Sequence, residues 1–177
     1  MGKRFEGAIM IALDVDGVLA DFYLAACRRY KKPYKRTMWA CDWLTREVME
    51  ELHGDYHFWR NLPVLSHPES IDFDFQCYMT SIDSRNKKAR EDWLTMNGFP
   101  EKEVIISNDK ITDCEKMGIK YLIDDCPKWR SSESVQVIPF NPSYLVEPFR
   151  RSIIHLSEVA DFIGEDTSWT KDVRNKL

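Results

Sequence analysis

The chain has 177 residues, of which 44% are hydrophobic and 31% are charged, and its formal net charge is -4. This size allows one domain with a small inserted part, and the mild acidity argues against a protein that holds long nucleic acids through their phosphates. No apolar run approaches the length of a membrane span, and the five cysteines form no CxxC pair, which favours reduced thiols over disulfides or zinc. We therefore expect a cytoplasmic protein whose partners include neither a polymeric nucleic acid nor a membrane.

Short apolar runs recur along the chain and predict an α/β protein. We expect strands at residues 8–13, 75–79, 104–106, 121–123 and 135–138. We expect helices at residues 24–30, 46–52, 87–97 and 157–163. The first run is apolar on both faces, as in the buried strands of parallel sheets. This alternation of strands and helices predicts a Rossmann-like three-layer sandwich, in which helices cover both faces of a parallel sheet.

Residues 22–65 interrupt the alternation, because they are rich in aromatic and charged side chains and follow the first strand directly. We interpret this stretch as a small helical cap. The predicted core domain then consists of residues 1–21 and 66–164, and residues 165–177 form a polar tail. Packing alone is the alternative explanation for the aromatic residues, since a small helical insert needs large side chains to bury anything.

Pairs of carboxylates follow two of the predicted strands. Asp14 and Asp16 come after the first strand, and Asp124 and Asp125 follow the strand at 121–123. Ligands of open α/β sheets sit beyond the carboxyl ends of the strands, so these acids are placed for chemistry. If the two strands are neighbours, the repulsion between the acids requires a hard divalent cation, and magnesium is the usual one beside a phosphate. The alternative for the first pair alone is a solvated turn.

Hydroxyl groups and a lysine follow other apolar runs. Phosphoryl transfer requires donors for the transferring oxygens, which the hydroxyls and backbone N–H groups of Thr80 and Ser81 would supply. Lys110, expected in a loop before the strand that carries the second acid pair, would supply a fixed positive charge. Thr80 also fits the role of a helix cap, and Lys87, at the start of the next helix, is the alternative lysine.

The order of these groups resembles the haloacid dehalogenase-like phosphatase superfamily. Its DxDGxx motif is matched by Asp14-Val15-Asp16-Gly17-Val18-Leu19, and its second motif, a strand that ends in Thr or Ser, resembles Tyr78-Met79-Thr80-Ser81. Its lysine resembles Lys110, and its terminal acid pair resembles Asp124-Asp125. Four motifs in this order, each after an apolar run, form a far more specific pattern than one DxDG alone.

A narrower resemblance is to the 5'(3')-deoxyribonucleotidases, which remove the phosphate from nucleoside monophosphates. The matching segments are residues 14–22, Phe58-Trp59-x-x-Leu62, 79–81, 109–110 and Leu122-Ile123-Asp124-Asp125-x-Pro127. The chain differs from that pattern at Ile82, where the family usually has Pro, and at Cys126, where it commonly has Arg. The resemblance implies an aromatic base pocket, for which Phe22, Trp39 and Phe58 are the candidates.

The resemblance also implies catalytic roles. Asp14 would attack phosphorus to form an aspartyl-phosphate, and Asp16 would protonate the leaving oxygen and then activate water. Thr80, Ser81 and Lys110 would hold the phosphoryl oxygens.

Magnesium is the implied cofactor, bound by Asp14, by the backbone carbonyl of Asp16, and by Asp124 or Asp125. The expected partner is a small nucleotide substrate, and a homodimer is allowed. Three alternatives stay open: another small phosphometabolite as substrate, a 3'-phosphate end of a nucleic acid, or a phosphate-binding relative without catalysis.

Overall fold

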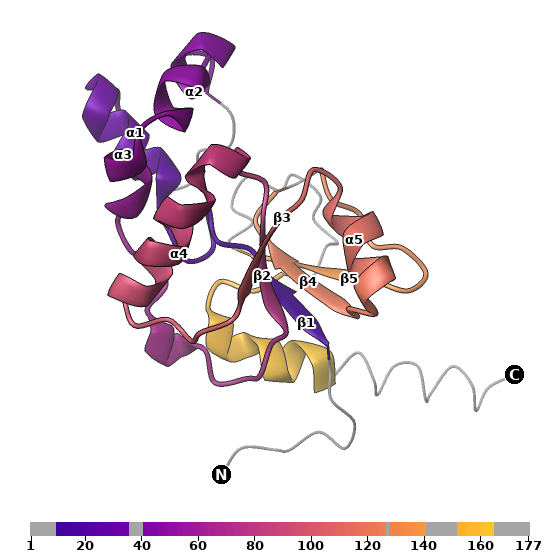
Figure 1. Cartoon of the computed structure of the whole chain (residues 1–177). Helices are drawn as coiled ribbons and strands as arrows, with labels where there is room; N and C mark the ends of the chain where they lie inside the picture. The colour runs from indigo at the N-terminus through magenta and orange to yellow at the C-terminus, as the bar shows by residue number, and fades with distance from the viewer. Residues whose placement is uncertain (1–9, 36–40, 127, 141–151, 165–177) are drawn as a thin grey trace, which may run out of the picture.

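Five parallel strands form one sheet in the computed structural model, which describes residues 10–35, 41–126, 128–140 and 152–164. The strands are β1 Ile11–Leu13, β2 Cys77–Thr80, β3 Glu103–Ile106, β4 Tyr121–Asp124 and β5 Gln136–Pro139. Each coincides with a predicted strand to within one or two residues at its described ends, whereas residues 8 and 9 lie outside the described residues. The predicted α/β class with a parallel sheet is therefore confirmed (Figure 1).

The strand order is β3-β2-β1-β4-β5, with β1 in the centre. Ala12 of β1 is paired with Cys77 of β2 on one side and with Leu122 of β4 on the other. The chain builds the sheet outward from β1 to β3 and then returns to add β4 and β5 on the opposite side. The direction of growth thus reverses between β1 and β4, which is where open α/β sheets bind their ligands.

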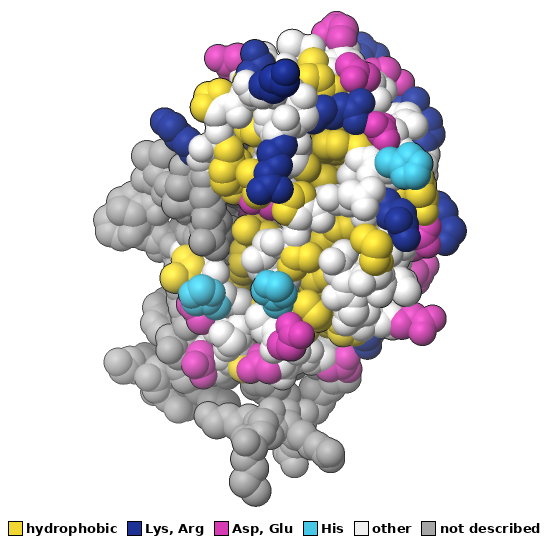
Figure 2. All heavy atoms as spheres, turned by 90° about the vertical axis from the view of Figure 1, so that its left-hand side faces the viewer, with side chains coloured by type: hydrophobic (Ala, Val, Ile, Leu, Met, Phe, Trp, Pro, Cys, Tyr) yellow, Lys and Arg dark blue, Asp and Glu magenta, His cyan; other side chains and the backbone are white. Residues whose placement is uncertain are grey.

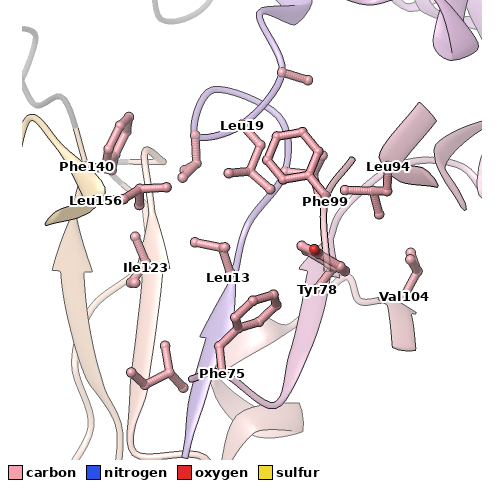
Figure 3. Close-up of a cluster of buried hydrophobic side chains, with 14 of the residues drawn as sticks. Leu13, Leu19, Phe75, Tyr78, Leu94, Phe99, Val104, Ile123, Phe140 and Leu156 are labelled. Carbon is pink, nitrogen blue, oxygen red and sulfur yellow. The ribbon is translucent and has the colours of Figure 1, made fainter. Parts of the chain in front are cut away.

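Helices lie on both faces of the sheet. They are α4 Lys87–Met96, α5 Lys110–Met117 and a helical segment at residues 159–164. Leu13 and Ile123 pack with Leu94 of α4 on one face (Figure 3), whereas their neighbours Ala12 and Leu122 pack on the α5 side. Alternate side chains of one strand point to opposite faces, so two apolar layers form around the sheet.

Three helices occupy the stretch between β1 and β2. They are α1 Phe22–Tyr30, α2 Arg46–His53 and α3 Tyr56–Arg60. Each begins after a side chain that accepts a hydrogen bond from the first turn: Asp21 from Leu24 N, Thr45 from Val48 N, and Asp55 from Phe58 N. The first two helices were predicted and the third was not. We call residues 22–65 the helical insert.

The chain enters and leaves the helical insert side by side. Asp21 N donates to Pro63 O at 2.8 Å, and Leu65 N donates to Leu19 O at 2.7 Å. Near the sheet, Trp93 of α4 donates from Nε1 to Leu62 O at 2.7 Å, so the insert is attached to the helix that covers the sheet. Figure 1 shows α1, α2 and α3 grouped beyond α4 at one side of the molecule.

The helix α5 was not among the predicted helices, and the expectation that Lys110 lies in a loop was wrong. Lys110 is not in a loop but is the first residue of α5. The helix begins here because Asp109 accepts hydrogen bonds from Thr112 N and Thr112 Oγ1, and it ends at Gly118 with a φ of 70°.

Short 3-10 helices lie at Pro68–Ser70, Ser84–Asn86 and Leu156–Glu158. Among the described residues, no helix combines the length and apolar character needed to cross a membrane. The predicted tail at 165–177 lies outside the described residues.

Candidate active site

Three carboxylates and one lysine meet at the carboxyl ends of β1 and β4. Asp14 directly follows β1, Asp124 is the last residue of β4, and Asp125 comes next. One carboxylate oxygen of each of these three residues lies within 4.8 Å of the other two. Lys110 Nζ lies 2.8 Å from Asp14 Oδ1 and 2.6 Å from Asp124 Oδ2, and its side chain is 2% exposed. We call these four residues the acid cluster. Its members come from three separate predicted motifs, which the fold brings together.

The acid cluster carries more negative than positive charge in a buried place. Burial, and then the charge of Asp124, hold the pKa values of Asp14 and Asp125 well above their ordinary range, although Lys110 opposes this. Burial also disfavours the charged form of Lys110, but Asp124 and Asp14 outweigh it and raise the pKa of the lysine.

A divalent cation fits this donor set. Three carboxylates against one ammonium group leave an excess of negative charge, and all donors are hard oxygens, which magnesium prefers.

A glycine allows the two strand ends to approach. Gly17 has a φ of +83°, and a Cβ placed on it would lie 1.9 Å from Asp125 Oδ2. The turn around it is closed by a 2.8 Å hydrogen bond from Gly17 N to Ala20 O. The DxDG motif therefore needs glycine for two independent reasons, the left-handed backbone and the space that Asp125 occupies.

Asp16 has partners other than those of the acid cluster. Its Oδ2 lies 3.3 Å from Thr80 Oγ1 at the end of β2, and its Oδ1 lies 2.5 Å from Nη2 of Arg90 on α4. Sequence reasoning did not single out Arg90. The available signal was its position on the apolar stripe of α4, where Ala89, Trp93 and Leu94 are also buried.

A cavity of about 240 Å³ opens beside these groups. It is lined by Asp14, Asp16, Gly17, Phe22, Tyr23, Met49, His53, Trp59, Thr80, Ser81, Ile82, Lys110, Asp125, Cys126, Lys128 and Trp129. Its polar end is thus formed by the strand ends, and most of its aromatic wall comes from the helical insert. Phe22 and Trp59 are stacked in that wall, with ring centroids 5.4 Å apart and an interplanar angle of 16°.

Not every predicted pocket residue lines the cavity. Among the described residues, Phe22 is in the wall, whereas Phe58 stands behind it with ring centroids 6.0 Å apart. Trp39 lies outside the described residues. Ser81 is in the wall and donates from Oγ to Ser107 O at 2.9 Å. The alternative lysine, Lys87, pairs with Glu91 of its own helix at 4.0 Å, so the structure brings Lys110 rather than Lys87 to the acids.

Several wall residues were not predicted to line the site. Met49 and His53 come from α2, and Trp129 comes from the segment after β4. Trp59 belongs to the matched segment Phe58-Trp59-x-x-Leu62, and of its two aromatic residues Trp59 lines the cavity, whereas Phe58, the named pocket candidate, does not.

The outer surface of the helical side carries mixed charge. Figure 2 shows this face, with basic and acidic side chains interspersed over its upper part. Arg29 pairs with Glu51 at 3.2 Å, and Arg85, which follows β2, pairs with Glu50 of α2 at 2.8 Å.

No protein-family model matches the chain, and no match was found among the curated proteins. Function is therefore inferred from the geometry of the site.

Proposed function

We propose that the chain is a magnesium-dependent phosphomonoesterase of the haloacid dehalogenase-like kind. Its substrates would be (deoxy)nucleoside monophosphates, as in the 5'(3')-deoxyribonucleotidases that its motifs resemble. The observation that carries the proposal is the convergence of Asp14, Thr80, Lys110 and the acid pair at the carboxyl ends of three adjacent strands, beside one cavity.

Asp14 is the proposed nucleophile. Within the described part of the chain, its side-chain contacts fall on Oδ1, which accepts from Val15 N at 2.7 Å and lies 2.8 Å from Lys110 Nζ. Oδ2 is thus the oxygen left to attack phosphorus. The new bond joins this oxygen to phosphorus while the ester P–O bond breaks, and the leaving oxygen takes a proton from Asp16. Asp16 then takes a proton from the water that hydrolyses the aspartyl-phosphate.

Thr80, Ser81 and Lys110 are the proposed donors to the phosphoryl oxygens, since all three line the cavity. The Ser81 hydroxyl already donates to Ser107 O, so Ser81 would donate through its backbone N–H, and the Thr80 hydroxyl would exchange its 3.3 Å contact with Asp16 Oδ2 for a phosphoryl oxygen. Fixed donors at this place stabilise the charge that develops on those oxygens during transfer.

The magnesium ion would be held by Asp14, the backbone carbonyl of Asp16 and one acid of the pair. Asp124 already accepts from Lys110 Nζ at 2.6 Å and from Cys126 N at 2.7 Å, which favours Asp125 as the direct ligand. When bound, the ion would neutralise the acids and polarise the phosphoryl group.

The helical insert would select the leaving group. Phe22 and Trp59 present stacked rings to the cavity, and aromatic faces bind planar bases by stacking. The cavity of about 240 Å³ supports a small ester as substrate. The mixed charge in Figure 2 likewise offers no continuous basic track on that face for a polymer.

The test is release of inorganic phosphate from all ribo- and deoxyribonucleoside monophosphates, with magnesium and with EDTA. Sugar phosphates and a 3'-phosphorylated oligonucleotide would be assayed in parallel. We expect magnesium-dependent release from at least one nucleotide and loss of at least about 10³-fold in kcat for Asp14→Asn. The exposed Asp72→Asn serves as the matched control. Absence of release from every nucleotide would refute the nucleotidase proposal.

A further inference from the structure

Arg90 of α4 is a fully buried cation outside the acid cluster, with a side chain that is 0% exposed. Its guanidinium carbon lies 5.5 Å from the ring centroid of Trp59 and 5.6 Å from that of Trp93. Both rings are fixed by their indole N–H groups, which donate to Leu52 O at 2.8 Å and to Leu62 O at 2.7 Å. The guanidinium group is therefore held between two rigid aromatic side chains.

The hydrogen bonding of Arg90 is incomplete. Nη2 contacts Asp16 Oδ1 at 2.5 Å, whereas Nε and Nη1 find no hydrogen-bond partner among the described residues. Burial of a guanidinium group with so few partners is unfavourable, and an apolar side chain of similar volume would fill the space between the rings without that cost. The faces of Trp59 and Trp93 attract a cation, but they supply no counter-charge. Among the described residues, the counter-charge comes from Asp16, the ionic partner of Arg90.

Each oxygen of the Asp16 carboxylate has a side-chain contact. Arg90 holds Oδ1 from α4, and Thr80 Oγ1 lies 3.3 Å from Oδ2 at the end of β2. Asp16 lines the cavity, whereas Arg90 is not among the residues that do so. Arg90 thus reaches the cavity through two of its lining residues, by an ionic contact with Asp16 and by packing on the ring of Trp59.

We propose that Arg90 is a positioning residue that clamps the Asp16 carboxyl group in the place where it exchanges a proton with the leaving oxygen. This inference rests on the proposed function, in which Asp16 is the acid and base. Without the clamp, the carboxyl group is free to rotate about its side-chain bonds, and a proton donor displaced by about 1 Å loses about 10²-fold in rate.

The decisive variant is Arg90→Met, which removes the charge and keeps much of the volume. We expect kcat/KM to fall about 10²-fold for an alkyl ester such as the best nucleotide substrate. The loss for p-nitrophenyl phosphate will be much smaller, because p-nitrophenolate leaves without protonation. Arg90→Lys retains the charge and should recover part of the loss. Lys88→Met, on the same helix with a side chain that is 73% exposed, is the matched control and should change neither value.

A second measurement does not depend on activity. The ¹⁵N-bound Hε of a buried arginine exchanges slowly with water, and the Arg90 signal is assigned by its absence in Arg90→Met. We expect this signal to shift in Asp16→Asn and to stay in place in Asp72→Asn.

The outcomes separate the two proposals. If the wild-type protein is inactive but its Arg90 signal responds to Asp16→Asn, the phosphatase proposal is refuted, whereas the positioning of Asp16 by Arg90 is supported. The proposal that Arg90 positions Asp16 is overturned if Arg90→Met loses kcat/KM equally on both esters or keeps full activity. It is also overturned if the Arg90 signal does not shift in Asp16→Asn. Thermal unfolding of each variant shows whether it is folded. If Arg90→Met is not, Arg90→Lys, which also lacks the arginine Hε, assigns the Arg90 signal, and the response of that signal to Asp16→Asn decides the case.

Discussion

The acid cluster and the helical insert meet at one cavity but are stabilised by different forces. The acid cluster consists of buried charges of opposite sign, with Lys110 Nζ at 2.8 Å from Asp14 and at 2.6 Å from Asp124. The helical insert is stabilised by contacts between aromatic rings, such as the stack of Phe22 on Trp59, and by capped helices. Surface ion pairs, such as Arg85 with Glu50, contribute as well. A change in charge should therefore damage the acid cluster severely, whereas the insert should tolerate changes of shape with graded effects.

This difference in stabilisation agrees with different roles for the acid cluster and the helical insert. Charges buried at the ends of rigid strands keep their positions, which chemistry requires. Phe22 and Phe58 are partly buried rings that pack against the core from helices outside the sheet, so we expect their exchange to disturb the strands less. We therefore expect the reaction to depend on the acid cluster and the choice of substrate to depend on the helical insert.

The largest effect should come from Lys110→Met. Removal of the cation leaves buried carboxylates without their partner, which typically costs about 3–5 kcal/mol of unfolding free energy. Urea denaturation measures this loss. Lys116→Met, on the same helix with a side chain that is 69% exposed, should leave stability nearly unchanged. Equal stability of the two variants would mean that Lys110 does not balance the acids.

Magnesium should stabilise the protein in a pH-dependent way. The pKa values of Asp14 and Asp125 are raised in the folded state, mainly by burial, so the folded state keeps protons that the unfolded chain releases. Without metal, stability should fall as pH rises from about 4, the ordinary carboxyl pKa, through the raised values.

The proposed magnesium ion would bind the ionised acids, so magnesium should raise Tm more at pH 8 than at pH 5. The gain is about 2.7 kcal/mol when the ion is present at 100 times its Kd. Differential scanning fluorimetry with magnesium or EDTA measures both trends. A shift in Tm that is the same at both pH values would contradict ion binding by Asp14 and Asp125.

Gly17→Ala should separate backbone strain from the space needed by Asp125. At a φ of +83° the alanine is strained, which costs about 1–3 kcal/mol, and its Cβ collides with Asp125. Gly118→Ala is the matched control, since it has a φ of +70° but no atom within 4 Å of the added Cβ. Both variants should lose stability, but only Gly17→Ala should lose magnesium-dependent activity. Full activity of Gly17→Ala would show that Asp125 can move without consequence.

The smallest effect should come from the aromatic wall. Phe22→Leu removes a ring that faces the cavity, and we expect KM to rise about five- to tenfold, since an aromatic contact contributes about 1 kcal/mol beyond its area. kcat should change little. Phe58→Leu alters a ring behind the wall and should leave KM unchanged. Steady-state kinetics on the best nucleotide distinguishes them, and equal KM values for both variants would argue against base stacking on Phe22.

Local sequence patterns predicted most of the fold. Short apolar runs are recognisable because both faces of a parallel strand are buried, and all five strands formed where expected. The whole of α5 was missed, because the stretch from Asp109 onward was taken as a loop before the next strand. The short helix α3 was missed for a similar reason, since five residues are too few to show a helical period.

The candidate site was predictable to the extent that each group follows its own strand. Asp14, Thr80 and the acid pair could be named because the carboxyl ends of parallel strands share one edge of the sheet. Arg90 could not, because a cation on the apolar stripe of a helix reveals its partner only after the helix is docked. Phe58 and Trp59 were distinguishable only by which of them faces the cavity.

By itself, the sequence determined the class of fold, the order of the strands along the chain and the acids that end them, because these depend on short-range periodicity and composition. Only the tertiary structure decided that β1 lies between β2 and β4, that Lys110 rather than Lys87 meets the acids, and that Arg90 holds Asp16. Contacts between side chains far apart in sequence depend on strand order and helix docking, and no local pattern encodes them.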